Sequence, residues 1–83
     1  SNSKPVFMSD NLFATKTRVL KNKHLKMEIV QDGSDIKLEA IAFNMAHKEH
    51  LVAAGLSFKA VYSIEINNYR NKSMLQLLIK DIK

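Results

Sequence analysis

The sequence predicts a small all-β barrel of five strands, with one short helix between the third and the fourth strand. Three observations predict it: five alternating or β-rich segments, one alanine-containing segment without that alternation, and turn residues between the segments. The 83 residues suffice for one domain with a modest core. We therefore expect a single domain at residues 11–83, preceded by an extended lead-in at residues 1–10. The first residues, "SNS", are typical of a tag remnant, and we expect a fragment of a longer protein.

The first three strands are predicted at residues 12–20, 24–30 and 36–44. The first is rich in Thr and Val and ends at the polar turn "KNK". The second alternates strictly, with Leu25, Met27 and Ile29 on the side expected to face the core. "QDGSD" at residues 31–35 predicts a turn centred on Asp32 and Gly33. The third strand alternates at first and then becomes apolar on both sides, which is typical of a strand covered on both faces.

A helix is predicted at residues 45–54, with Asn44 as its N-cap and Gly55 as the residue after its end. The last two strands are predicted at residues 58–67 and 73–82, joined by the polar loop 68–72. Their alternation places apolar side chains on one face of each strand: Tyr62, Ile64, Ile66, Leu75, Leu77 and Ile79. The order β-β-β-α-β-β is the layout of the OB-fold, a five-stranded Greek-key barrel.

The charge balance favours a polyanionic partner. Thirteen Lys and Arg against eight Asp and Glu give a net charge of +5, which fits nucleic acid and fits solubility alone equally well. No cysteine is present, so disulfides and thiolate metal sites are excluded. No apolar stretch approaches the ~20 residues of a membrane span, and the N-terminus lacks the pattern of a signal peptide, so no membrane partner is expected.

Nothing in the sequence predicts an enzyme active site. His47 and His50 are three residues apart, but the spacing is not that of the zinc motif His-Glu-x-x-His, and no third ligand is evident. With only two glycines, no Gly-rich phosphate loop can be formed. No Ser-His-Asp arrangement or paired-carboxylate pocket can be argued either. We therefore expect no catalytic residue and no metal ligand in this chain.

Several segments together resemble a known family: "KPVFM", "HLKMEI", "AIAFN" and "VYSIEINNYRNKSMLQLLIKDI". Over residues 4–82 the chain resembles the C-terminal OB domain of RecJ, the bacterial 5′-to-3′ exonuclease specific for single-stranded DNA. The resemblance implies a cytoplasmic, nucleoid-associated parent hydrolase that acts in DNA repair and recombination. It also implies that catalysis lies in preceding DHH and DHHA1 domains holding Mn²⁺ or Mg²⁺. None of their catalytic residues has a matching position here, so no cofactor is expected in this fragment.

The resemblance implies single-stranded DNA as the partner. Proteins that bind single strands combine cations for the phosphates with aromatic side chains for the bases. OB-folds place these groups on the face of strands two and three and on the loops joining strands one–two and four–five. We expect Tyr69 to be the stacking platform. The cations expected around it, gathered from both loops into one compact rim, are Arg18, Lys21, Lys23, Lys26, Arg70 and Lys72.

One departure from the family pattern and several alternatives accompany this prediction. The family's last hairpin often has Gly in its turn, where this chain has "YRNKS", and Asn71 is the next-best residue for a left-handed backbone. Loop lysines are often only solvated, and Tyr69 could simply cap the barrel. Phe43, at the end of the third strand, is the less favoured platform. The alternative function is a structural domain of the nuclease, or one that docks a DNA-repair partner protein, with little DNA affinity of its own.

Overall fold

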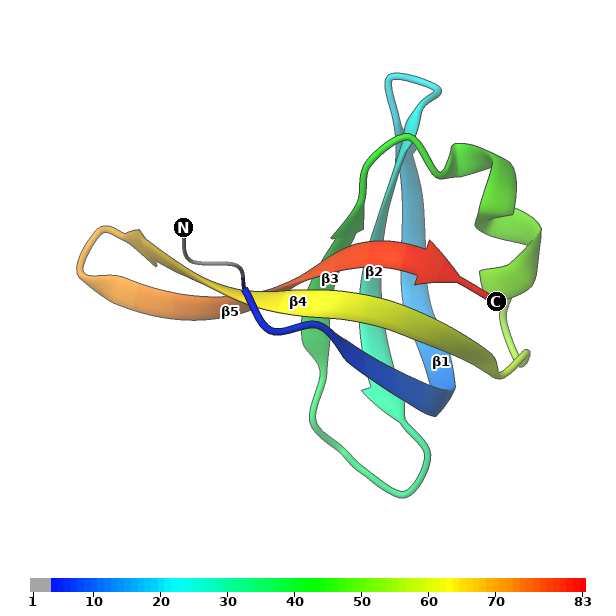
Figure 1. Cartoon of the computed structure of the whole chain (residues 1–83), viewed down its shortest axis with the longest axis horizontal. Helices are drawn as coiled ribbons and strands as arrows, with labels where there is room; N and C mark the ends of the chain where they lie inside the picture. The colour runs from blue at the N-terminus through cyan, green and yellow to red at the C-terminus, as the bar shows by residue number, and fades with distance from the viewer. Residues whose placement is uncertain (1–3) are drawn as a thin grey trace.

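Five strands close into a barrel in the computed structural model, which describes residues 4–83 (Figure 1). The strand order around the barrel is β1-β2-β3-β5-β4, and β4 pairs with β1 to close it. β3 and β5 are parallel, and the other neighbours are antiparallel. The elements are β1 (Phe7–Leu20), β2 (His24–Gln31), β3 (Leu38–Ala42), the 3-10 helix η1 (Ala46–Val52), β4 (Phe58–Tyr69) and β5 (Lys72–Ile82). The predicted OB-fold is confirmed.

The core lies inside the barrel and is built by the alternation predicted for the second strand. Leu25, Met27 and Ile29 are all buried, and small Ala40 and Ala42 lie opposite two of them on β3. Large side chains on one strand thus meet small ones on the next, which suits the interior of a narrow barrel. The remaining core residues come from every other element: Leu12, Val52, Phe58, Ala60, Leu77, Ile79 and Ile82.

The first strand begins at Phe7, five residues before the predicted start at Leu12. Phe7 and Met8 pair with β4, so part of the predicted lead-in belongs to the barrel. The polar stretch around Asn11 obscured this in the sequence. Asn11 has a φ of +54°, and the register of β1 on β4 shifts between Ser9 and Leu12, so the strand bends here. Before the bend β1 pairs with β4, and after it β1 pairs mainly with β2.

The third strand and the helix are both shorter than predicted. β3 covers Leu38–Ala42, and η1 is a 3-10 helix over Ala46–Val52. Asn44 is not an N-cap: its φ is +58°, and its backbone N–H donates to His24 Nδ1 at 3.0 Å. Gly55 lies beyond the helix, in a turn closed by the N–H of Leu56 donating to the carbonyl of Ala53. Its φ of +85° suits the third position of that turn.

β4 and β5 continue past the barrel as a two-stranded arm, residues 64–75, which extends to one side in Figure 1. Pairing with β1 stops at Tyr62 and pairing with β3 stops at Gln76, so in the arm each strand pairs only with the other. The predicted apolar face is present, but only its inner half is buried. Beyond the barrel, nothing among the described residues covers the outer half, where the exposed side chains are Ile64, Ile66 and Leu75.

The C-terminal end of the barrel is tied to η1 by a salt bridge. Lys48 Nζ donates to Asp81 Oδ1 and to the carbonyl of Ile82. The backbone N–H of Ile82 also donates to the Asp81 carboxylate. The hydrogen bond from Lys48, with that from Ile82, lowers the pKa of Asp81 below the ordinary value of 3.8.

None of the helices in residues 4–83 is long and apolar enough to cross a membrane.

Replacing Asp81→Asn is expected to lower the free energy of unfolding at neutral pH. Because the pKa of Asp81 is lower in the folded state, its charge stabilises the fold above the unfolded-state pKa, and this contribution is lost as pH falls through the folded value. Denaturant titrations from neutral pH down to below 3.8 should therefore show the gap between the two proteins narrowing with acidification. A gap that is constant across that range would contradict the assignment.

Candidate nucleic-acid interface

The outer sides of four adjacent strands form one continuous surface, called here the outer face. Its side chains lie in cross-strand rows set by the strand register. The row nearest the β1–β2 turn contains Leu20, His24 and Phe43. The next row contains Arg18, Lys26, Ile41 and Leu78. The third row contains Lys16, Glu28, Glu39 and Gln76.

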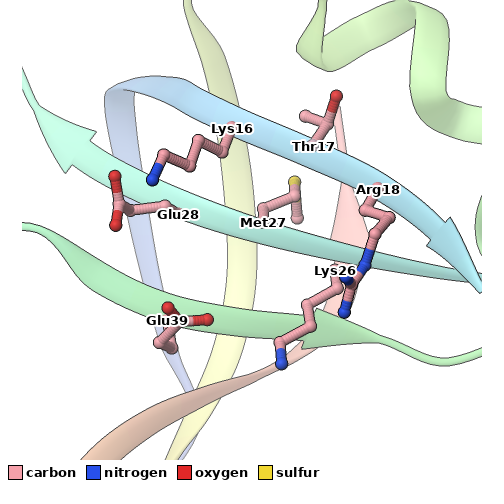
Figure 2. Close-up of a pocket in the computed structure, with 7 residues that line it drawn as sticks. All are labelled: Lys16, Thr17, Arg18, Lys26, Met27, Glu28 and Glu39. Atoms are coloured by element: carbon pink, nitrogen blue, oxygen red, sulfur yellow. The ribbon is translucent and has the colours of Figure 1, made fainter.

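A groove of about 480 Å³ lies over the second and third rows (Figure 2). Figure 2 shows Arg18 and Lys26 together toward one end of the groove, with Glu28 and Glu39 toward the other. The third groove cation, Lys16, lies opposite Glu28 on β1. The groove therefore has a basic end next to the β1–β2 turn and an acidic end away from it.

The cations of the groove have no ion-pair partner among residues 4–83, whereas one of its carboxylates does. Among residues 4–83, Lys16, Arg18 and Lys26 form no salt bridge, so each is free to bind an external anion. Glu28 is already engaged, because the Thr15 hydroxyl donates to it at 2.7 Å and Lys37 Nζ lies 4.0 Å away. Phosphate oxygens are therefore expected at the basic end.

The β1–β2 turn carries two of the predicted cations beside the first row. Lys21 and Asn22 have φ of +54° and +57°, and the N–H of Lys23 donates to the carbonyl of Leu20 at 3.0 Å. Two left-handed central residues make this a turn that matches the twist of a hairpin. The N–H of Ala46 donates to the carbonyl of Lys23, which fixes the turn against the start of η1. Lys21 and Lys23 are exposed there.

Phe43 is a candidate interface residue to which the sequence prediction gave less weight than to Tyr69. Its side chain is 53% exposed, and its ring meets the edge of the His24 ring at a centroid distance of 5.2 Å. His24 Nδ1 also accepts a hydrogen bond from the Asn44 N–H. The His24 side chain therefore contacts both the Phe43 ring and the backbone of the next residue. Phe43 is two residues beyond Ile41, so alternation along the chain, combined with the register of β3 on β2, could have placed it beside His24.

The tip of the arm carries the other predicted residues. Tyr69 and Lys72 pair across a two-residue turn in which Arg70 and Asn71 have φ of +50° and +63°. The expected left-handed conformation of Asn71 is confirmed. The Tyr69 side chain is 67% exposed, and the Arg70 guanidinium carbon lies 5.1 Å from its ring centroid. This contact is a cation–π interaction, and it holds both side chains at the tip.

The two loops do not gather into one rim around Tyr69. Figure 1 shows the β1–β2 turn and the arm tip at different ends of the molecule. Antiparallel pairing carries the outer face from Gln76 along the arm through the pairs Asn67–Met74 and Tyr69–Lys72. The arrangement is therefore an extended surface with Phe43 near one end and Tyr69 at the other. The predicted compact rim is wrong because the arm carries the β4–β5 turn beyond the barrel, away from the β1–β2 turn.

No metal centre is present within residues 4–83. His47 and His50 are exposed on η1, and the described residues contain no group of three or more His, Asp or Glu side chains that could hold a metal ion. The groove offers cations and single carboxylates, which suit an anionic polymer better than a metal.

The chain was compared with known proteins. No match to the sequence of a curated protein was found. Two crystal structures of the mitochondrial single-stranded DNA binding protein from S. cerevisiae share the fold, with TM-scores of 0.53 and 0.57. Both are 16% identical in sequence, and each alignment covers 99% of this chain and 95% of the yeast chain. Residues 1–81 match the RecJ OB domain family, and the chain therefore belongs to that family.

Proposed function

We propose that this domain binds single-stranded DNA along the outer face. The observation that carries the proposal is a groove with three cations that form no salt bridge among residues 4–83: Lys16, Arg18 and Lys26. The outer face around this groove has an exposed aromatic side chain near each end, Phe43 and Tyr69. Membership of the RecJ OB domain family supports it. So does the fold shared with the yeast single-stranded DNA binding protein. Phosphates would bind the cations, and bases would stack on Phe43 and Tyr69.

The domain would serve a larger RecJ-type enzyme. That enzyme would be a bacterial 5′-to-3′ single-strand-specific DNA exonuclease of DNA repair and recombination, cytoplasmic and associated with the nucleoid. Its DHH and DHHA1 domains would hold Mn²⁺ or Mg²⁺ and carry out the hydrolysis. The residues of this chain would hold the strand beside that catalytic groove.

The proposal is tested by fluorescence anisotropy of a labelled oligo-dT of about 15 nucleotides, the upper range of an OB-fold site. Three phosphate contacts predict a slope of about −2 for log affinity against log salt, because each contact on a single strand contributes about −0.7. Binding should therefore weaken between about 50 and 200 mM salt. A folded domain that does not bind at low salt would refute the proposal.

Tyr69→Ala is expected to weaken oligo-dT binding by about fivefold, the lower end of the range for base stacking, because Arg70 already occupies part of the ring surface. Tyr69→Phe keeps the π-face and should bind like the unmodified protein. The thermal midpoint should stay the same in both variants, since the side chain is exposed at the arm tip. Equal losses in both variants would mean that the hydroxyl, rather than the ring, makes the contact.

A second function is favoured by the apolar side of the arm. Ile64, Ile66 and Leu75 share one face and are 42%, 65% and 49% exposed. An uncovered apolar face of this kind is typical of a protein contact, which fits a domain that packs on the rest of the nuclease or docks a repair partner. If that were the main role, Ile66→Ser would disrupt assembly with the partner, and charge reversal in the groove would leave DNA processing unchanged.

A further inference from the structure

The acidic end of the groove is not explained by phosphate binding. A carboxylate repels phosphates, so Glu39 opposes rather than supports a purely electrostatic interface. Glu28 is engaged by Thr15 and Lys37, but Glu39 forms no hydrogen bond or salt bridge with residues 4–83. Glu39 is half-buried in β3 and lines the groove.

Gln76 lies directly beside Glu39, as its partner on β5. The Gln76 Oε1 accepts a hydrogen bond from Asn67 Nδ2 at 3.1 Å, which fixes the amide orientation. Its Nε2 donates to no described residue, so two N–H donors remain. A carboxylate that only accepts therefore stands next to an amide nitrogen that only donates.

This pair fits base edges that carry an amino donor best. Cytosine and adenine each present an exocyclic amino donor beside a ring-nitrogen acceptor, and guanine presents N–H donors beside a carbonyl acceptor. Thymine also presents a donor beside an acceptor, its imide N–H next to a carbonyl. A second carbonyl flanks that N–H, however, and repels a carboxylate that accepts from it. With the phosphates held by Arg18 and Lys26 at the basic end, base edges are left for the acidic end (Figure 2).

We propose that Glu39 and Gln76 select bases that carry an exocyclic amino group over thymine at one position of the bound strand. This selection rests on the proposed function and refines it, because an OB-fold that bound only phosphates and ring faces would have no such preference. The carboxylate would accept from the amino group, and Gln76 Nε2 would donate to the neighbouring acceptor. The repulsion between the carboxylate and the second carbonyl of thymine would favour the amino-bearing bases by about fivefold.

The test compares oligo-dC and oligo-dT of equal length by anisotropy at fixed salt. Cytosine and thymine have rings of the same size, so stacking differs little between them. The unmodified protein should bind oligo-dC about fivefold or more tightly. Glu39→Ala should bind both oligonucleotides with similar affinity. The matched control is Glu49→Ala, which removes one negative charge from exposed η1 and should leave the ratio unchanged.

The outcomes separate the two proposals. A ratio near one in the unmodified protein, or a ratio that Glu39→Ala leaves intact, overturns the base selection while strand binding stands. Absence of binding to both oligonucleotides overturns strand binding itself. Circular dichroism of each variant checks that the barrel is folded, and Glu39→Gln provides a second variant of closely similar shape that should also reduce the ratio.

Discussion

Reversing both charges at the basic end of the groove, with Arg18→Glu and Lys26→Glu, is expected to weaken oligo-dT binding by about 100-fold. Each side chain would contribute one charge-assisted contact worth about 1.5–3 kcal/mol, and 1.4 kcal/mol corresponds to a factor of ten. The two residues are cross-strand partners, so both changes act at one place on the strand. The salt dependence should also become shallower, because fewer counterions are released. Anisotropy titrations at two salt concentrations measure both effects.

The control for this variant has the same net charge. Lys59→Glu with Lys83→Glu changes two exposed lysines that are paired through their backbones near the C-terminus and do not line the groove. This control should lose far less affinity, because only the weak long-range field of the protein changes. Equal losses in the two double variants would mean that overall charge, and not the groove, attracts the strand.

Phe43→Ala is expected to weaken oligo-dT binding by about tenfold or more, because a base stacked on an aromatic side chain is worth about 1–3 kcal/mol. The ring is exposed and packs against the His24 ring in a T-shaped contact, so it is already positioned before a base arrives. The salt dependence should stay the same, since no phosphate contact is removed. Phe43→Trp should retain or increase the affinity.

Phe7→Ala is the matched control for Phe43→Ala. Phe7 is also partly exposed, but its ring packs near Tyr62 at the start of β1, away from the groove. Its loss should leave DNA binding unchanged. If Phe43→Ala binds as tightly as the unmodified protein while Tyr69→Ala does not, the strand would follow the arm and not reach the first row.

The barrel itself could be predicted because its signals are local. Strict alternation at Leu25, Met27 and Ile29 and the Asp32–Gly33 turn each indicate their own structure, and both predictions are confirmed. The predictions that were wrong depended on distant partners. The first strand begins at Phe7 because β4 supplies hydrogen-bond partners there, and Asn44 adopts a left-handed conformation while its N–H bonds to His24. Neither partner lies near in sequence.

For the candidate interface, the structure tests where the predicted residues lie, and only part of that placement could be predicted from the sequence. Arg18 and Lys26 do lie together, because the short β1–β2 turn fixes their register. Tyr69 and the β1–β2 turn do not lie together, because the arm extends β4 and β5 beyond the barrel. Lys16 and Glu39 could not be placed together from the sequence, because they share a row only through the register of β1 on β2 and that of β2 on β3.

The most direct test of strand binding by the outer face is a two-dimensional amide NMR titration of the domain with oligo-dT at low salt. We predict shifts concentrated at Arg18, Lys26 and Phe43 and continuing along the arm to Tyr69, with little change at Ile64 and Ile66 on its apolar side. Shifts confined to the apolar side of the arm, or no shifts in a folded domain, would contradict the account.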